Sequence, residues 1–537
     1  MNLLTLLIGS GIIFTIAYFT YGKYLEKKLG VDGNRPTPAV TMADGVDYVA
    51  AKKPVLLGHH FATIAGGGPI VGPITAVVFG WIPAVIWIIV GSIFVGGVHD
   101  FASLQASLRH RAQSIGTIIK AYMGGRGQTL FLAFSIATLI LIVGVFIILV
   151  KDTFSAVPQA ATASVLFIGI AMVFGVLVNQ IRMNFVLASV LGVLAMLLSI
   201  WVGIAFPLEL SGGTWVVILL IYAYAASVMP VWMLLQPRDY LNSFLLYGMM
   251  IGAVLGIILA NPEIKMAGYT GFYNETLGFM FPILFITIAC GAVSGFHSLV
   301  SSGTTAKQLD NEKNGRFITY GSMLLEGFLA IIAIGAVAYL SQAEFTSRMA
   351  ELGGPVGTFS AGVGFFMSHW GIPEVTATTF TALTASAFLM TTLDSATRLG
   401  KYAVQELAET RSRFFHHHHI ATLVIVAGAG VLALSGTWSA VWPLFGSANQ
   451  MLGAIALLAV SVWLVKSGVK AWFAILPMIF MFIVTLAALI VLLQSNFAKG
   501  QYFLAGSAFV LLILCIILAM EAWRSLTAAN DDTSVKI

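Results

Sequence analysis

The sequence predicts an all-α polytopic membrane protein with about fifteen transmembrane helices, and its composition is the main reason. Of the 537 residues, 59% are apolar and only 9% are charged, whereas an ordinary soluble domain carries about 25% charged residues. The mean hydropathy is +0.95, which is more apolar surface than a soluble core can bury. The apolar residues form long unbroken runs rather than the short alternating strands of a membrane β-barrel. We therefore expect lipid to be the solvent for a set of helices.

Apolar runs of about 20 residues are long enough to cross a bilayer. Such runs lie at 3–21, 59–80, 82–104, 128–150, 161–178, 184–206, 214–235, 243–260, 278–298, 318–340, 374–396, 418–436, 441–465, 470–493 and 501–522. The glycine-rich stretch 356–369 is too short for a span, and we expect an external or re-entrant helix there. No polar segment is long enough for a soluble core. No G-x-x-x-x-G-K-[ST] phosphate loop is present, so an ATP-driven pump is disfavoured.

The basic residues predict the orientation, because cytoplasmic loops carry an excess of Lys and Arg. With the N-terminus outside, only Lys151, Lys265, Arg348 and Lys499 of the 27 Lys and Arg residues fall on the external side. We therefore expect a multi-pass protein of the bacterial inner (cell) membrane with a cytoplasmic C-terminus. The formal charge of +5 then reflects cytoplasmic loops, and no nucleic-acid partner is expected.

Two spans look interrupted, and interrupted spans are typical of transport sites. The second contains Gly66, Gly67, Gly68 and Pro69 near its middle, and the seventh contains Ser227 and Pro230. A break frees backbone amides at the start of a half-helix, whose dipole can hold a carboxylate. We therefore predict that these six residues bind the substrate. The alternative is that the glycines permit close helix packing and that the proline is a tolerated kink.

The two interrupted spans lie five apart and run in opposite directions, which predicts an inverted repeat. Residues 1–58 would form an N-terminal transmembrane helix and a cytoplasmic loop. Residues 59–206 would form the first five-helix repeat and 207–396 the second, inverted one. Residues 397–537 would add four C-terminal transmembrane helices and a short tail.

Several motifs resemble the carbon starvation protein A family, in order from about residue 55 to 455. They are Gly58-His59-His60-Phe61-Ala62, His99-Asp100-Phe101, Leu235-Gln236-Pro237-Arg238-Asp239-Tyr240, Cys290-Gly291-Ala292-Val293-Ser294-Gly295-Phe296-His297, Ser301-Ser302-Gly303-Thr304-Thr305, Leu324-Leu325-Glu326-Gly327, Leu393-Asp394-Ser395-Ala396-Thr397-Arg398 and Trp442-Pro443-Leu444-Phe445-Gly446. The resemblance implies the amino acid–polyamine–organocation superfamily, with a LeuT-like 5+5 inverted repeat core and extra flanking helices. It also implies uptake of pyruvate with proton coupling, and peptide uptake during carbon starvation.

We thus expect a symporter that imports pyruvate or a similar small carboxylate across the lipid bilayer. A small-peptide transporter and a Na⁺-coupled carrier are the alternatives, and a channel is the least favoured. An enzyme is not expected, because no nucleophile–base motif is present. No cofactor is expected beyond the coupling ion, H⁺ or Na⁺, with a transition metal as an alternative.

Ionisable side chains inside spans cost roughly 2.5–3.5 kcal/mol each on insertion scales, so each is a candidate for function. The candidates for ion coupling or a gate are His59, His60, His99, Asp100, His297 and Glu326. All but the glutamate lie at a similar depth toward the cytoplasm. Histidine titrates near physiological pH, and His59, His60, His99 and Asp100 could instead ligate a metal. Glu326 lies inside the tenth span and is a candidate proton carrier.

Three further patterns complete the candidate residues. Ser294, Ser298, Ser301 and Ser302 in the ninth span could complete a sodium site, or could simply bond to helix carbonyls. Asp394 and Arg398 are four residues apart on one helix face and are predicted to form a structural ion pair. Cys290 and Cys515 are interpreted as packing residues. The run His416 to His419 is assigned no role.

Overall fold

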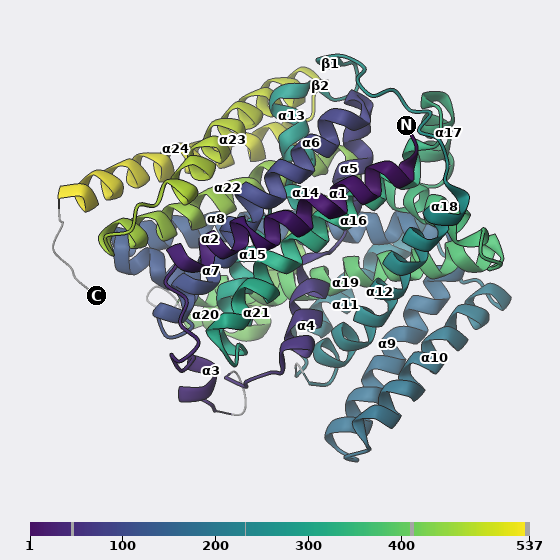
Figure 1. Cartoon of the computed structure of the whole chain (residues 1–537), viewed down its shortest axis with the longest axis horizontal. Coiled ribbons are helices and arrows are strands. Elements are labelled where there is room, and N and C mark those ends of the chain that lie inside the picture. The colour runs from purple at the N-terminus through teal and green to yellow at the C-terminus, as the bar shows by residue number, and fades with distance from the viewer. Residues whose placement is uncertain (45–47, 231, 409–412, 532–537) are drawn as a thin grey trace.

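The structure, a computed structural model, describes residues 1–44, 48–230, 232–408 and 413–531 and is almost entirely helical (Figure 1). A small antiparallel hairpin of β1 (Tyr273–Asn274) and β2 (Gly278–Phe279) lies in the loop before α13. The helices, with short 3₁₀ or π turns labelled η, are α1 (Leu3–Phe19), α2 (Tyr21–Lys28), α3 (Pro38–Thr41), α4 (Lys53–Ile64), α5 (Gly68–Ala76), η1 (Val77–Phe79), α6 (Trp81–Gly91), η2 (Ser92–Gly96), α7 (Gly97–Arg109), α8 (Ile115–Ala156), α9 (Pro158–Asn179), α10 (Phe185–Ala205), α11 (Gly212–Val228), α12 (Leu235–Ala260), α13 (Met280–Thr287), α14 (Ala289–Ala292), α15 (Phe296–Gly303), η3 (Thr305–Lys307), η4 (Glu312–Asn314), η5 (Arg316–Tyr320), α16 (Gly321–Ala338), α17 (Gln342–Glu351), α18 (Pro355–Ser368), α19 (Glu374–Ala408), α20 (Arg413–His416), α21 (His418–Ser435), α22 (Trp438–Lys466), α23 (Trp472–Ala498) and α24 (Tyr502–Asp531).

Helices occupy all of the predicted spans, but the predicted count of fifteen is not confirmed. Among the described residues, eleven helices are long and apolar enough to cross a membrane, or twelve if the bent pair α4–α5 is one span. Three predicted spans do not meet this standard: α11 has only 17 residues, α13–α15 is interrupted, and α19 is too polar. The stretch predicted as a separate short helix is α18, which packs against α12, α16 and α19. Its placement relative to the bilayer stays a prediction.

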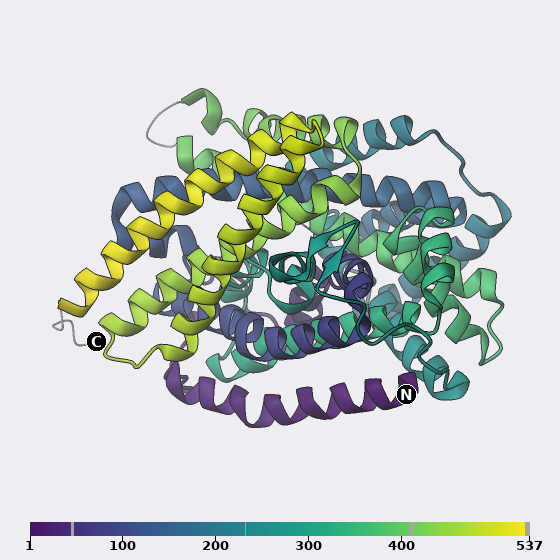
Figure 2. The same ribbon diagram turned by 90° about the horizontal axis from the view of Figure 1, so that it is seen from above.

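The centre of the molecule is built around α8, which packs along both α19 and α22. The α9–α10 hairpin and the α23–α24 pair lie at opposite ends of the long axis (Figures 1 and 2). Their outer faces carry exposed apolar side chains, including Leu194, Leu198, Ile483 and Phe509. A lipid-facing helix has this character, because its backbone bonds are satisfied internally and only its side chains meet the solvent.

The second predicted span is interrupted where its glycines predicted. The helix α4 ends at Ile64 and α5 begins at Gly68, and the two axes are bent by 45°. Pro69 lies in the first turn of α5, where the N–H that proline lacks would have no partner in the helix. The residue types alone therefore predict this break.

The predicted interruption of the seventh span is wrong. The helix α11 is continuous and stops before Pro230, which is exposed. The proline ring disfavours helical geometry in the preceding residue, and Met229 is accordingly extended. The second interruption lies instead in the ninth predicted span, where α13, α14 and α15 are separated at Ile288 and, by an extended Val293, at residues 293–295.

Each interrupted segment is followed by a helix with a wide turn. The helix α6 continues into α7 through the π turn η2, and the π turn η5 opens α16. Such turns hold more residues than an α-helical turn and are frequent at functional sites. The helix α5 packs against α14 and α16, while α15 packs against α4 and α7. We call α4–α5, α6–α7, α13–α15 and η5–α16 the four-segment unit.

Candidate functional site

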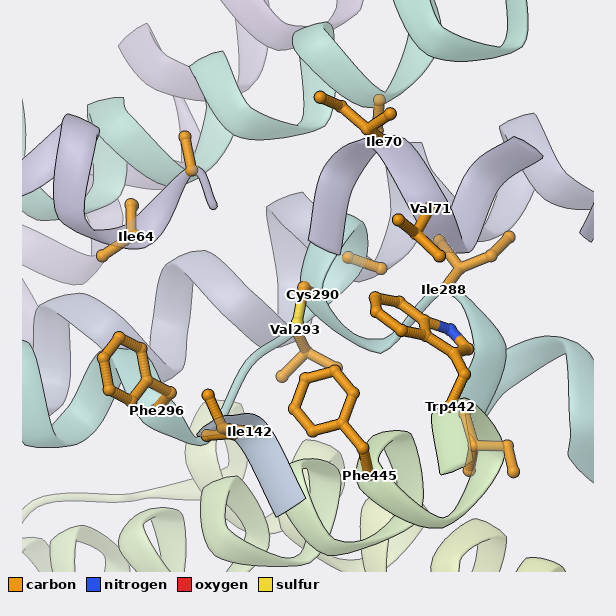
Figure 3. Packing of buried hydrophobic residues seen from close by; sticks show 14 of the residues in the cluster. Ile64, Ile70, Val71, Ile142, Ile288, Cys290, Val293, Phe296, Trp442 and Phe445 are labelled. Carbon is orange, nitrogen blue, oxygen red and sulfur yellow. The ribbon is translucent and has the colours of Figure 1, made fainter. Parts of the chain in front are cut away.

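The break between α4 and α5 is closely packed against α14 and α19. A β-carbon added at Gly68 would overlap the side chain of Cys290, and one added at Gly66 would overlap Thr392. Figure 3 shows Cys290 beneath α5, with Trp442 and Phe445 of α22 below it. The close packing that the sequence left open as an alternative is therefore present, and it occurs at the break itself.

Beside this break, four ionisable side chains from three helices form a buried chain, which we call the Asp100 network. Asp100 of α7 is its centre: its Oδ1 lies 2.9 Å from His99 Nδ1, and its Oδ2 lies 2.9 Å from Nδ1 of His297 on α15. The other ring nitrogen of His297, Nε2, lies 3.4 Å from Oε2 of Glu326 on α16. All four side chains are at most 1% exposed.

The network adjoins the helix break directly. The backbone of Ile64, the last residue of α4, is a further hydrogen-bond partner of the His297 ring. Cys290, which meets Gly68, lies close enough to Glu326 to interact with it electrostatically. The interruption before α15 allows this arrangement, because it starts a new helix at Phe296 and places His297 in its first turn.

The hydrogen bonds determine where a mobile proton can lie. An ionised carboxylate only accepts, so His297 Nδ1 donates to Asp100. In a neutral imidazole the remaining nitrogen then carries a lone pair, and so does the Glu326 oxygen that faces it. Two lone pairs repel at this distance, so a proton on either His297 or Glu326 would stabilise the pair. Neither oxygen of Glu326 has a hydrogen-bond partner within the described protein.

The two adjacent histidines of α4 have different partners. His60 is buried, with its Nδ1 2.8 Å from Thr305 Oγ1, and it is near enough to Asp100 and His297 to interact electrostatically. His59 is only partly buried and has its Nδ1 3.5 Å from Asp239 Oδ2 on α12. His59 therefore lies apart from the Asp100 network, because neighbouring residues on a helix point about 100° apart.

The metal alternative receives no support from the geometry. In the parts of the chain that the structure describes, no three His, Cys, Asp or Glu side chains are arranged to hold a metal ion. The predicted set of His59, His60, His99 and Asp100 is divided, because His59 turns away toward α12.

The four serines predicted for sodium are all buried in or just before α15, and two of them bond to backbone carbonyls. Ser298 donates to Gly295, and Ser302 donates to Ser298. Ser294 bonds to the Asn449 side chain, and Ser301 has no partner within the described protein. A sodium site here stays a prediction.

The predicted ion pair of Asp394 with Arg398 is wrong. The Asp394 carboxylate instead pairs with Arg238 of α12, at 2.6 Å, and also accepts from the Tyr222 hydroxyl of α11, at 2.7 Å. Arg238 donates in addition to Thr391 Oγ1 at 2.8 Å. The predicted pair followed the spacing within one helix, and nothing in the local sequence points to an arginine 156 residues away.

Arg398 and its neighbour Lys401 bind the end of α11 instead. Arg398 donates to the carbonyls of Ala226 and Met229, each at 2.7 Å, and Lys401 donates to the carbonyl of Ser227 at 2.8 Å. The last carbonyls of a helix lack partners and carry the negative end of its dipole, so two cations are well placed there.

The predicted role of Ser227 and Pro230 in substrate binding is not tested by this contact and stays a prediction. The Ser227 hydroxyl lies 3.3 Å from Thr422 of α21, and α11 packs mainly against α8, α19 and α21. The residue that faces Gly68 is Cys290 of α14. The one proline of the ninth predicted span, Pro282, lies near its start, and residues 283–298 contain none, which explains why the interruption was missed.

The comparisons with known proteins agree with the resemblance that the motifs indicated. The carbon starvation protein CstA family matches residues 2–354 and 346–488. The chain belongs to the carbon starvation protein CstA family. The peptide transporter CstA of Escherichia coli is 34% identical, covering 91% of this chain and 81% of the relative. The pyruvate/proton symporter BtsT of Escherichia coli is 32% identical, covering 95% and 84%.

Other similarities cover the chain as fully. The peptide transporter CstA of Bacillus subtilis is 29% identical over 100% of this chain and 99% of the relative. A solved manganese transporter of Eremococcus coleocola aligns with 90% of this chain and 99% of its own, at 13% identity and a TM-score of 0.45. The Asp100 network, Arg238 and Asp394 all lie inside the residues that match the CstA family. With its many apolar helices, this CstA-family chain is a multi-pass membrane transporter.

Proposed function

We propose that this chain is a proton-coupled symporter that imports pyruvate or a similar small carboxylate. The observation that carries the proposal is the buried contact between His297 and Glu326, which a proton on either partner would stabilise, next to an interrupted helix. Two carboxylates around one imidazole carry a net negative charge even when His297 is protonated, and Asp100 and Glu326 are both fully buried. An uncompensated buried charge is costly, so the site favours taking up one more proton.

The break supplies the place for the substrate. In α5, Ile70 and Val71 both donate to the carbonyl of Gly67, which leaves the amides of Gly67 and Gly68 without a backbone acceptor among the described residues and able to face a ligand. The positive end of the α5 dipole favours a carboxylate at this position. Thr392 adds a buried hydroxyl without a partner in the described protein. Because Cys290 and Thr392 pack directly against the break, the unit must open for a substrate to reach it, and a small carboxylate needs less opening than a peptide.

Coupling follows from the short distance between these two parts. A substrate carboxylate at Gly68 brings a negative charge close to the Asp100 network, and the network accepts this charge more readily when it holds its extra proton. The protonated network and the bound substrate therefore stabilise each other, and the two are carried together.

The direction and the fold are part of the same proposal. The basic residues support an N-terminus outside and a cytoplasmic C-terminus in the bacterial inner membrane. The interrupted α4–α5 with α6–α7, and the interrupted α13–α15 with η5–α16, support two related halves of a superfamily with an inverted repeat.

Peptide transport is the second candidate, and the names of the relatives support it. Peptide transporters CstA from Campylobacter jejuni and Escherichia coli are 33% and 34% identical to this chain. A peptide would need a longer cavity and a partner for its amine. Opening of the unit around the break, with Glu326 as that partner, would provide both.

The deciding experiment measures uptake of labelled pyruvate into proteoliposomes under an imposed inward proton gradient or an inward sodium gradient. We expect accumulation with protons only. Accumulation with sodium only would mean that sodium, bound by the serines of α15, is the coupling ion instead of protons. Competition by di- and tripeptides but not by lactate would transfer the proposal to peptides. Absence of accumulation under both gradients, in sealed and oriented vesicles, would overturn it.

A further inference from the structure

Three buried serines each lie one helical turn from a member of the Asp100 network. Ser103 follows Asp100 by three residues on α7, Ser301 follows His297 by four on α15, and Ser322 precedes Glu326 by four on α16. Residues three or four apart share a helix face. All three serines are 0% exposed, and none of their hydroxyls has a hydrogen-bond partner within the described protein.

The serines lie on the same side of the network. The helices α7 and α15 run in the same direction, because Asp100 meets His297 and, further on, Ser107 donates to the carbonyl of Ser302 at 3.2 Å. The segment η5–α16 runs the opposite way, because Arg109 at the end of α7 pairs with Glu312 before it. Each serine is therefore nearer than its charged neighbour to the Arg109–Glu312 end of the unit.

The polar character continues toward that end. Both amide atoms of Gln105 are buried without a partner in the described protein. Ser107 donates to the carbonyl of Gln113 at 2.8 Å. His110 is partly exposed, and its Nε2 lies 3.1 Å from the Tyr122 hydroxyl. Polar groups thus extend from the fully buried network to a side chain that meets solvent.

A purely structural role could explain one buried serine of this kind, but it does not explain three around the same network. Serine inside a membrane helix usually donates to the carbonyl one turn back, as Ser302 does. Ser103, Ser301 and Ser322 do not, and an unpaired buried hydroxyl costs free energy. Water molecules commonly bond to such groups in protein interiors.

We propose that Ser103, Ser301 and Ser322 line a hydrated path that carries protons between the Asp100 network and the Arg109–Glu312 end of the molecule. The path rests on the proposed proton coupling and specifies the route that the proton takes. Hydroxyls both donate and accept, so a chain of serines and waters passes a proton along without holding a charge. The titratable groups at one end of the path are the Asp100 network itself and the adjacent His60. Those at the other end are Arg109, His110 and Glu312.

The test compares a double variant, Ser103→Ala with Ser322→Ala, against the unmodified full chain in proteoliposomes. One measurement is pyruvate uptake driven by a proton gradient, with internal acidification followed by a trapped pH dye. The other is counterflow, the exchange of labelled for unlabelled pyruvate without a gradient, which needs the substrate site but no net proton transfer. Ser135→Ala is the matched control, because Ser135 on α8 is also buried and unpartnered in the described protein.

We expect proton-driven uptake and acidification in the double variant to fall by about tenfold, as the loss of hydrogen-bonding groups implies. Counterflow should change by less than about twofold, and Ser135→Ala should leave both reactions intact. Unchanged proton-driven uptake would overturn the path, and so would an equal loss of counterflow, since the serines would then support the substrate site itself. If uptake by the unmodified chain does not respond to the proton gradient, the proposed function is wrong, and the path that rests on it is wrong too.

Discussion

Removal of one partner of the Arg238–Asp394 ion pair should destabilise the protein more than removal of both. The two side chains are each 1% exposed and their atoms lie 2.6 Å apart. Asp394→Asn would leave the arginine buried with only neutral partners, and Arg238→Met would leave the carboxylate with the Tyr222 hydroxyl. Breaking a buried pair in this way costs about 3–5 kcal/mol.

The double variant, Arg238→Met with Asp394→Leu, removes both charges and leaves the Tyr222 hydroxyl unpaired. An unpaired buried hydroxyl costs about 1–3 kcal/mol, so the double variant should be more stable than either single one by about 2 kcal/mol. Unfolding in mixed micelles, titrated with a denaturing detergent and followed by tryptophan fluorescence, would give the free energies.

A half-exposed pair on the same protein provides the control. Lys151 and Asp152 lie 2.7 Å apart, with side chains 24% and 22% exposed, and an exposed pair is worth about 0–1 kcal/mol. Asp152→Asn should therefore have a small effect. The reasoning would be refuted if Asp394→Asn lowered the free energy of unfolding as little as Asp152→Asn does. It would also be refuted if the effects of the Arg238 and Asp394 substitutions were additive, since the pair would then be in contact with water.

Three further outcomes are expected. Gly68→Leu should abolish uptake of labelled pyruvate, because the break has no room for a side chain. Gly169→Leu should not, since nothing lies within 4 Å of its added β-carbon. Uptake by both variants would show that the substrate does not bind at the break. Asp100→Asn should lower proton-driven uptake by about tenfold to a hundredfold, the loss expected for hydrogen bonds to a charged group, and a wild-type rate would contradict the proton site. The hydrogen bond from the Ser341 backbone N–H lowers the pKa of Glu344, so the cap of α17 is fully formed above the pKa of an unfolded glutamate and is lost as the pH falls through the lowered pKa of Glu344. Hydrogen–deuterium exchange at the start of α17 should therefore rise in acid. A pH-independent exchange pattern would argue against this cap.

The sequence predicted those features that a short segment determines. Helix positions followed from apolar runs, because a chain in lipid must satisfy its backbone within each helix. The break at Gly66 to Gly68 was predictable for the same local reason, since three glycines and a proline disfavour a continuous helix. Pro230 carried an equally strong signal but ended a helix instead of interrupting one, and a single proline does not distinguish these outcomes.

The features that sequence reasoning missed depend on residues far apart in the chain. Residues 283–298 contain no proline, and the extended backbone at Val293 brings His297 to the end of α4, as no local preference would. The pairing of His297 with Asp100 joins residues 197 positions apart. Their chemistry marked each of them as a candidate, but only the packing of α7 against α15 assigns them to one another.

The wide turn at Ser92–Gly96 determines the direction in which part of the site points. A regular helix advances about 100° for each residue, so deleting one residue inside this turn would rotate His99 and Asp100 about the helix axis while Trp87, on the other side, kept its contacts. The turn at Arg316–Tyr320 has the same control over Glu326. A relative could therefore gain or lose the Asp100 network through one inserted or deleted codon, with every chemically important residue still present. Sequence comparisons that score only substitutions would not detect such a change.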